Sequence, residues 1–223
     1  MLGTAAKNLK KFILKECKMK KKLDDFIEIY DDSMPESLID LFVEFFDNNP
    51  SLQSQGRVQN HSGEGAIVPD VKLSTDISAY DLPGSLRDEY VYHTQQCLNK
   101  YCEKYTESNT VARFGITEHF NMQKYEPHEG FKAWHKEHEG NGNPAHGVRH
   151  LVFMTYFNTV KDGGGTEFLY QKRTLDAVKG RTVIWPAGWT HTHRGVVSKT
   201  ETKYIMTGWW NFIPQQTDQG EVT

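Results

Sequence analysis

Five strand-like runs in the second half of the chain constrain its fold more than any other feature. They lie at Ile116–Tyr125, Leu151–Asn158, Thr182–Trp185, Thr190–Val197 and Lys203–Phe212. Clusters of Gly, Pro, Asn and Asp separate these runs, among them the consecutive glycines that end at Gly165. Helical patterns occupy the preceding residues, and helices followed by several short strands favour an α+β, mostly β domain. We therefore expect an antiparallel sandwich or jelly roll with N-terminal supporting helices.

Two helices are predicted before these strands. The first begins at Ser33-Met34-Pro35-Glu36, where Ser33 would cap the helix and Glu36 would close a capping box, and it ends before Pro50. The second runs from Pro83 to about Glu107. Its apolar stripe predicts core packing by Leu86, Tyr90, Thr94, Cys97, Leu98, Tyr101 and Tyr105.

Short extended segments and one long loop complete the prediction. Leu23–Tyr30 and Val71–Ser78 have the composition of short strands. Residues 50–70 are polar and contain glycine, which predicts a loop that could cover the mouth of an active site. The sequence contains no repeat and no internal linker, so residues 23–223 are predicted to form a single domain after a lysine-rich segment at 1–22.

Charge and cysteine content limit the partners that we expect. The chain has a formal net charge of −3. Residues 1–22 contain eight lysines and one acidic residue, a net charge of +7, so residues 23–223 carry a net charge of about −10. An acidic body argues against nucleic-acid binding. The basic segment lacks the apolar core of a signal peptide, and no run is long enough for a membrane helix, so membrane association is not expected. The three cysteines are odd in number and not spaced as a zinc site, which favours reduced thiols and a cytoplasmic protein.

A histidine and a carboxylate at His135-Lys136-Glu137 form the motif most suited to chemistry. Two residues two apart on an extended strand point to the same side. The later segment WTHTHRG supplies a second imidazole, from either His191 or His193. Two imidazoles and one carboxylate on one face, with open coordination positions, suit a non-haem Fe(II) centre that reacts with O2.

Lys203 is the second candidate for a functional role. It lies ten residues after His193, where the next strand of a hairpin would return it to the metal. The apolar run that follows indicates a covered strand, and a buried lysine requires an anionic partner. A carboxylate of a bound small molecule would satisfy that requirement.

Four ordered motifs resemble the prolyl 4-hydroxylase-like branch of the Fe(II)/2-oxoglutarate oxygenases. They are Y-x-P…G-F…H-x-E, Y-F-N-x-V…G-G-G-T-E-F, K-G-R-T-V-I-W-P, and H-R-G…K-Y-I…W, all between about residue 116 and residue 212. The resemblance implies a double-stranded β-helix of the cupin-like jelly-roll type. The chain departs from the family's usual pattern at Glu137, where aspartate is common.

The resemblance also implies roles for individual residues. His135, Glu137 and His193 match the iron ligands and thus the catalytic centre. Lys203 matches the cation that binds the distal carboxylate of 2-oxoglutarate. The remaining matches to residues near the co-substrate are Tyr125, Tyr156 and Thr166. Four nearby aromatic residues are expected to form the walls of the site: Phe131, Trp134, Trp185 and Trp189.

The activity implied by the resemblance is a dioxygenase reaction. It would use Fe(II), 2-oxoglutarate and O2, with ascorbate as a further candidate, and would hydroxylate a C–H bond with succinate and CO2 as co-products. The expected substrate is a prolyl residue in a peptide or protein. Two alternatives are the same chemistry on a free amino acid or small metabolite, and a non-catalytic jelly-roll module that binds a metal or a sugar. The sequence does not indicate an oligomeric state.

Overall fold

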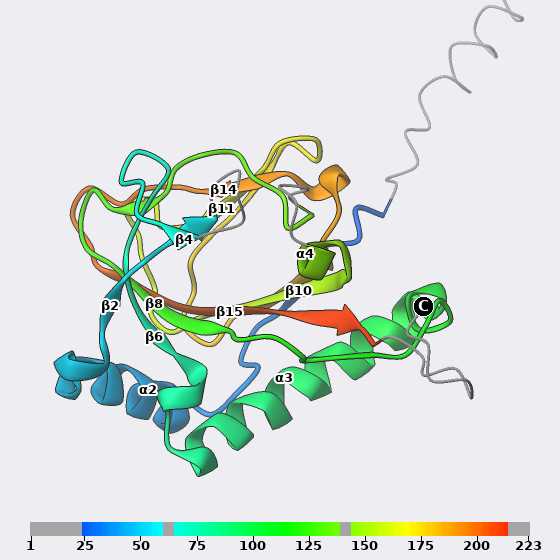
Figure 1. The fold of residues 1–223 in the computed structure, drawn as a ribbon, viewed down its shortest axis with the longest axis horizontal. Helices are drawn as coiled ribbons and strands as arrows, with labels where there is room; N and C mark the ends of the chain where they lie inside the picture. Colours follow the sequence, from blue (N-terminus) through cyan, green and yellow to red (C-terminus); the bar gives the residue numbers. More distant parts are fainter. Residues whose placement is uncertain (1–23, 60–64, 139–143, 214–223) are drawn as a thin grey trace, which may run out of the picture.

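Two antiparallel sheets face each other in the structure, a computed structural model that describes residues 24–59, 65–138 and 144–213 (Figure 1). The larger sheet has the order β1-β13-β10-β15-β8-β6-β2, with β7 beside β15. Its strands are β1 (Glu28–Tyr30), β2 (Ser54–Gln55), β6 (Thr75–Ser78), β7 (Phe114–Gly115), β8 (Asn121–Tyr125), β10 (Arg149–Tyr156), β13 (Thr182–Pro186) and β15 (Lys203–Phe212). The smaller sheet has the order β12-β11-β14, from β11 (Thr166–Phe168), β12 (Arg173–Leu175) and β14 (His193–Gly195).

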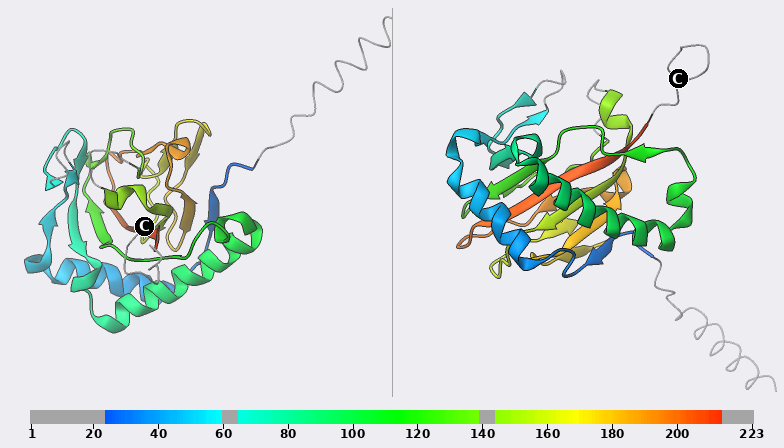
Figure 2. Two further views of the ribbon diagram at one scale, coloured as in Figure 1. Left: turned by 45° about the vertical axis from the view of Figure 1, so that its right-hand side comes forward. Right: turned by 90° about the horizontal axis from the view of Figure 1, so that it is seen from below.

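Helices α2 (Glu36–Asn48) and α3 (Gly84–Lys104) cover the outer face of the larger sheet (Figures 1 and 2). The smaller sheet lies on the opposite side, so the larger sheet is the middle layer. The remaining short elements are β3 (Val58–Gln59) paired with β4 (Gly65–Ala66), β5 (Lys72–Leu73) paired with β9 (Gly130–Phe131), α4 (Pro144–Gly147), and the 3-10 turns η1 (Pro50–Leu52), η2 (Ala79–Asp81), η3 (Thr106–Asn109) and η4 (Trp189–His191).

The central strands are apolar along most of their length because both of their faces are covered. On β15, Tyr204, Met206 and Trp210 pack in the core beneath the helices. Ile205 and Trp209, which alternate with them, pack in the second core between the two sheets. Because side chains alternate along a strand, its two faces pack into two separate cores. The inner face, between the sheets, is then available for a functional site.

This architecture confirms the mostly β jelly roll with N-terminal supporting helices. The tyrosine-containing stripe on α3 is core, because Tyr90, Thr94, Cys97, Leu98 and Tyr101 are buried. Among the described residues, no helix is long and apolar enough to cross a membrane. The lysine-rich segment at 1–22 lies outside the described residues.

The predicted capping box at the start of α2 is wrong. Pro35 occupies the N-cap position, and no side chain caps the helix. The hydroxyl of Ser33 instead donates to the carbonyl of Gly180 at 2.9 Å and lies 2.7 Å from the Thr182 hydroxyl. Ser33 therefore ties the chain to the larger sheet, a tertiary contact that local capping rules do not anticipate.

Three extended segments also differ from their predictions. The first strand covers only Glu28–Tyr30, and residues 50–70 contain η1 and the short strands β2, β3 and β4 rather than a plain loop, with 60–64 outside the described residues. The run predicted at Thr190–Val197 divides into the end of turn η4 and the short strand β14. Strands β1, β2 and β14 lie at the edges of their sheets, where turns and tertiary contacts decide the backbone more than periodicity does.

Gly208 provides a test of how closely the core beneath the helices is packed. A Cβ atom at this position would lie 2.5 Å from Phe120 Cβ and 2.5 Å from Phe153 Cζ. We expect Gly208→Ala to lower the free energy of unfolding by about 1–3 kcal/mol, the usual cost of overpacking. Urea denaturation would measure it, with Gly84→Ala as the control, because the only nearby atom there belongs to the flexible Arg87 side chain at 3.9 Å. Equal stability of the two variants would contradict this prediction.

Candidate active site

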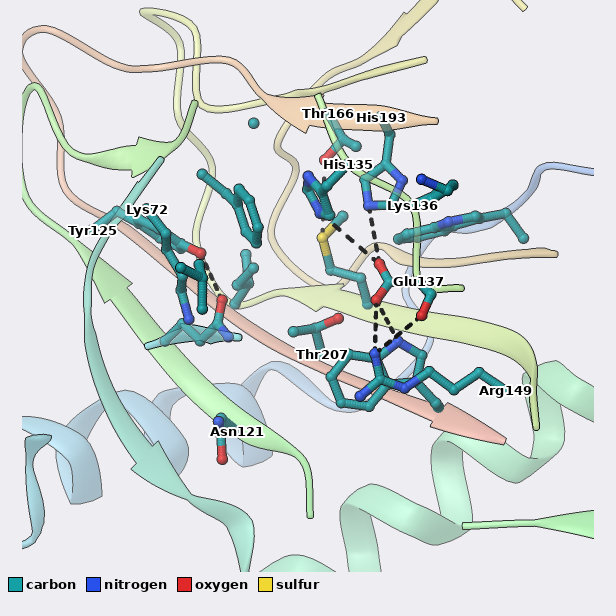
Figure 3. A pocket seen from close by; sticks show the side chains of 18 of the residues that line it. Lys72, Asn121, Tyr125, His135, Lys136, Glu137, Arg149, Thr166, His193 and Thr207 are labelled. Carbon is teal, nitrogen blue, oxygen red and sulfur yellow. Dashed lines mark hydrogen bonds and ion pairs between the residues drawn. The ribbon is translucent and has the colours of Figure 1, made fainter. Parts of the chain in front are cut away.

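Three side chains from two distant segments converge between the sheets (Figure 3). His135 Nε2 lies 3.9 Å and His193 Nε2 lies 3.4 Å from the same carboxylate oxygen, Glu137 Oε1. All three potential ligand atoms lie within 4.8 Å of one another. A backbone bridge between His135 and His193 fixes this arrangement, with N–H to carbonyl distances of 2.9 Å in both directions.

Both imidazoles are oriented by backbone carbonyl groups. His135 Nδ1 lies 3.0 Å from the carbonyl of Ala133, and His193 Nδ1 lies 2.9 Å from the carbonyl of His191. A carbonyl accepts only from a protonated nitrogen, so these contacts place the proton on Nδ1 and leave the Nε2 lone pair facing Glu137. Burial, followed by the nearby His193, lowers the pKa of His135 to about 3, which keeps its imidazole neutral. Neutral imidazoles of this tautomer are ready to bind a metal.

The carboxylate of Glu137 is buried yet ionised. Burial alone would raise the pKa of this carboxyl, but its contacts with His193, His135 and the Arg149 guanidinium lower it below its usual value. A carboxylate oxygen and two imidazole Nε2 atoms form a donor set that fits a divalent metal ion such as Fe(II). The residues present therefore fit the metal that the sequence resemblance implies.

A cavity of about 230 Å³ extends from these three residues between the sheets. Lys203, at the start of β15, lines its inner part and is only 5% exposed. Among the described residues its ammonium has no acidic partner, and it lies 4.6 Å from the centre of the Tyr125 ring. A Cβ atom built on Gly195 would lie 3.7 Å from Lys203 Nζ, so a small residue leaves room for the lysine. The cavity thus offers a buried positive charge beside the triad.

The burial of Lys203 predicts a distinctive pH dependence. Burial lowers its pKa from 10.5 to about 8. Between these values the unfolded chain retains a proton that the folded chain has released, so the free energy of unfolding should rise with pH across this window. The rise is bounded by about 3 kcal/mol at about 1.4 kcal/mol per unit. Urea denaturation at several pH values should show the wild-type protein gaining stability relative to Lys203→Met across this window; parallel curves for the two proteins would refute the prediction.

The other predicted co-substrate residues occupy two different positions. Tyr125 and Thr166 line the cavity. Tyr156 is fully buried and does not line it; its hydroxyl lies 2.7 Å from the Thr166 hydroxyl. Tyr156 therefore contacts Thr166 from behind, and any influence on a bound molecule passes through that threonine. The Tyr125 hydroxyl donates to Gln123 Oε1 at 2.6 Å.

Some expectations about the neighbourhood of the triad are corrected. His135 and Glu137 do not lie on a regular strand, because the segment forms only the isolated bridge at His135. His191 lies in turn η4, and its Nε2 is 2.9 Å from the carbonyl of Asp25, away from the triad. Trp189 is 64% exposed and forms no wall of the site. Of the other aromatic residues, Phe131 stacks on His135 with ring centres 3.6 Å apart, Trp185 lines the cavity, and Trp134 does not.

Sequence reasoning missed two cavity residues that contact Glu137. Arg149 and Trp209 both approach its second oxygen, Oε2, at 3.3 and 2.9 Å. A signal for Trp209 was present, because it lies on the same side of β15 as Lys203 at spacings of two residues. Arg149 precedes an apolar run and shows no local pattern that would identify it.

The family comparison is consistent with this geometry. Residues 115–211 match the family model of the 2OG-Fe(II) oxygenase superfamily. These residues form a 2OG-Fe(II) oxygenase domain, and enzymes of this superfamily use Fe(II), 2-oxoglutarate and O2. The matched segment contains the triad that could hold a metal ion, and the protein is an Fe(II)/2-oxoglutarate-dependent dioxygenase. The alternative of a non-catalytic binding module is therefore set aside. No curated protein sequence matches the chain.

Solved structures of prolyl hydroxylases share the fold of this oxygenase. A viral collagen prolyl hydroxylase from Paramecium Bursaria Chlorella virus-1, in a 2OG complex, has a TM-score of 0.61 and 15% identity over 84% of this chain and 97% of its own. A Pseudomonas putida prolyl-4-hydroxylase has a TM-score of 0.61 and 14% identity over 84% and 93% of the two chains. A Trichoplax adhaerens prolyl hydroxylase, in complex with a hypoxia inducible factor peptide fragment, has a TM-score of 0.64 and 14% identity over 84% of both chains.

Proposed function

We propose that this oxygenase hydroxylates prolyl residues in a peptide or protein, releasing succinate and CO2. The observation that carries the proposal is the position of the buried Lys203 ammonium in the same cavity as His135, Glu137 and His193. A buried cation without an acidic partner among the described residues requires an anionic ligand. The distal carboxylate of 2-oxoglutarate satisfies this requirement while the rest of the molecule reaches toward the triad.

In this proposal His135, Glu137 and His193 hold Fe(II) through their Nε2 atoms and Oε1. The iron would supply the activation of O2 that drives both the decarboxylation of 2-oxoglutarate and the hydroxylation of a C–H bond. The chain supplies orientation and exclusion of water: Phe131 and Trp185 cover the imidazoles, while Lys203 sets the direction of the co-substrate. Thr166 and Tyr125 are the further groups that would contact it, with Tyr156 holding Thr166 in place.

The choice of a prolyl substrate draws support from the fold. The three similar structures above are prolyl hydroxylases, and one of them contains a bound peptide fragment. Arg57, which is exposed, and Val58, the first residue of β3, also line the cavity in this chain. A peptide that approaches from this side would leave the part of the cavity around Lys203 free for the co-substrate.

Succinate formation with candidate substrates tests the proposal. The protein is first titrated anaerobically with Fe(II) and 2-oxoglutarate, and the visible charge-transfer band of the chelated metal is recorded. Succinate is then measured in air with proline-containing peptides, with the same peptides carrying alanine for proline, and with free amino acids. We expect a peptide that contains proline to stimulate succinate formation and to gain the mass of one oxygen atom.

The possible outcomes separate the parts of the proposal. Stimulation by a free amino acid alone would exclude the peptide substrate and keep the chemistry. Equal stimulation by the proline and alanine peptides would exclude proline as the hydroxylated residue. Absence of both the charge-transfer band and succinate, with folded protein, would exclude the assigned iron and co-substrate sites.

A further inference from the structure

The two oxygens of the Glu137 carboxylate have different partners. Oε1 faces the imidazoles of His135 and His193. Oε2 accepts hydrogen bonds from the Trp209 indole N–H at 2.9 Å and from the Arg149 guanidinium at 3.3 Å. The dashed contacts in Figure 3 show this division, with Arg149 on the side of Glu137 opposite His193. The metal-facing side of the carboxylate is thus limited to one oxygen.

Arg149 is itself held firmly. Its Nε and Nη2 atoms donate to the two carboxylate oxygens of Glu118 at 2.8 and 2.6 Å. Its guanidinium lies 3.6 Å from the centre of the Trp209 ring, in cation–π contact. Asn211 donates to the same Glu118 at 2.9 Å. With its guanidinium held by Glu118 and by the Trp209 ring, Arg149 has little freedom to move its remaining nitrogen, Nη1, which donates to Glu137.

We propose that Arg149 and Trp209 are positioning residues that hold Glu137 Oε2 and so make Glu137 a one-oxygen metal ligand. This inference rests on the proposed function, because it assigns a role relative to the metal. A glutamate side chain is longer by one methylene than aspartate and can turn both oxygens toward a cation. Two donors on Oε2 prevent that turn and keep coordination positions open for the co-substrate and O2.

Trp209→Phe is the sharpest variant for this inference. It removes the indole N–H and retains an aromatic ring for the Arg149 guanidinium. Loss of an outer contact to a metal ligand typically weakens metal binding 10–100-fold, so we expect the dissociation constant for Co(II) to rise about tenfold or more. The ligand-field bands of bound Co(II) should also change, because the freed carboxylate can use both oxygens. Trp189→Phe, at an exposed indole that does not line the cavity, should leave both readouts unchanged.

A double-mutant cycle with Glu137→Asp distinguishes positioning from general structural support. The shorter aspartate cannot lie against His193 and also reach Trp209 and Arg149. Trp209→Phe should therefore add less than about a threefold further loss of Co(II) affinity in the Glu137→Asp background, because interacting residues give non-additive effects. Independent, multiplying losses would show that Trp209 does not act through Glu137 and would overturn the inference.

Arg149→Lys provides a second measurement in the same assay. Lysine keeps the positive charge but cannot donate to Glu118 and Glu137 in a fork, so we expect weaker Co(II) binding and altered bands with this variant as well. Wild-type affinity and bands in both Trp209→Phe and Arg149→Lys would exclude the positioning role while leaving the proposed function intact. Failure of the wild-type protein to bind Co(II) or Fe(II) would instead refute the proposed function. Thermal unfolding of each metal-free variant confirms that it is folded.

Discussion

Replacement of His193 by alanine is expected to abolish Fe(II) binding and to reduce succinate formation to background. His193 Nε2 lies 3.4 Å from Glu137 Oε1, and its Nδ1 contact orients the lone pair toward the centre of the triad. Without this imidazole only His135 and Glu137 remain, and two ligands do not retain a divalent ion against water and competing chelators. Anaerobic Fe(II) titration with a chelator as competitor measures the effect.

His191→Ala is the matched control for that variant. His191 lies two residues away, is also buried, and contacts the carbonyl of Asp25 with Nε2 and the Thr190 hydroxyl with Nδ1. Its own backbone carbonyl, which orients His193, survives the substitution. We therefore expect some loss of stability, about 1–3 kcal/mol, but retained Fe(II) binding. Iron binding that is lost in His191→Ala and kept in His193→Ala would mean that the wrong imidazole has been assigned.

Lys203→Ala is expected to raise the Michaelis constant for 2-oxoglutarate about 100-fold while leaving Fe(II) affinity nearly unchanged. Removal of one partner from a buried charge pair costs about 3 kcal/mol or more, and each 1.4 kcal/mol is about a factor of ten in affinity. The metal should be spared because Lys203 contacts Tyr125 and the region of Gly195 rather than the triad. Succinate formation at increasing 2-oxoglutarate concentrations, with metal titration in parallel, measures both quantities.

Lys124→Ala controls for the loss of a lysine from the same pair of strands. Lys124 faces the other side of the larger sheet, where it contacts Glu126 at 2.9 Å and lies 5.5 Å from the centre of the Tyr204 ring. We expect a normal Michaelis constant for this variant. If Lys203→Ala also shows a normal constant, the anchor for the distal carboxylate lies elsewhere in the cavity. Simultaneous loss of Fe(II) binding would indicate a collapsed site instead of a lost anchor.

Local patterns were sufficient to predict the strand that carries Lys203 and the long helix α3. The apolar run that follows Lys203 correctly indicated a covered strand, because each face of β15 packs in a core of its own. The stripe on α3 was likewise readable as core packing. Such features are predictable because hydrophobic periodicity follows directly from backbone geometry.

Local rules failed where a distant segment supplied the partner. Ser33 has the sequence context of a helix cap, yet its hydroxyl contacts Gly180 and Thr182. His191 and His193 are two residues apart, a spacing that would point both side chains inward on one strand. A 3-10 turn instead directs His191 toward Asp25. In both cases a tertiary hydrogen bond replaces the local one, and nothing in the neighbouring residues indicates this.

The sequence by itself determined the class of fold, the order of its elements and the types of residue available for a metal and an anionic co-substrate. These follow from periodicity and motif order, which are properties of short segments. Motif order had already singled out His193; only the tertiary structure decided that His191 turns toward Asp25, that Tyr156 lies behind Thr166, and that Arg149 and Trp209 contact one carboxylate oxygen. These contacts join residues from different strands, and their geometry depends on how the two sheets pack together, which no short segment specifies.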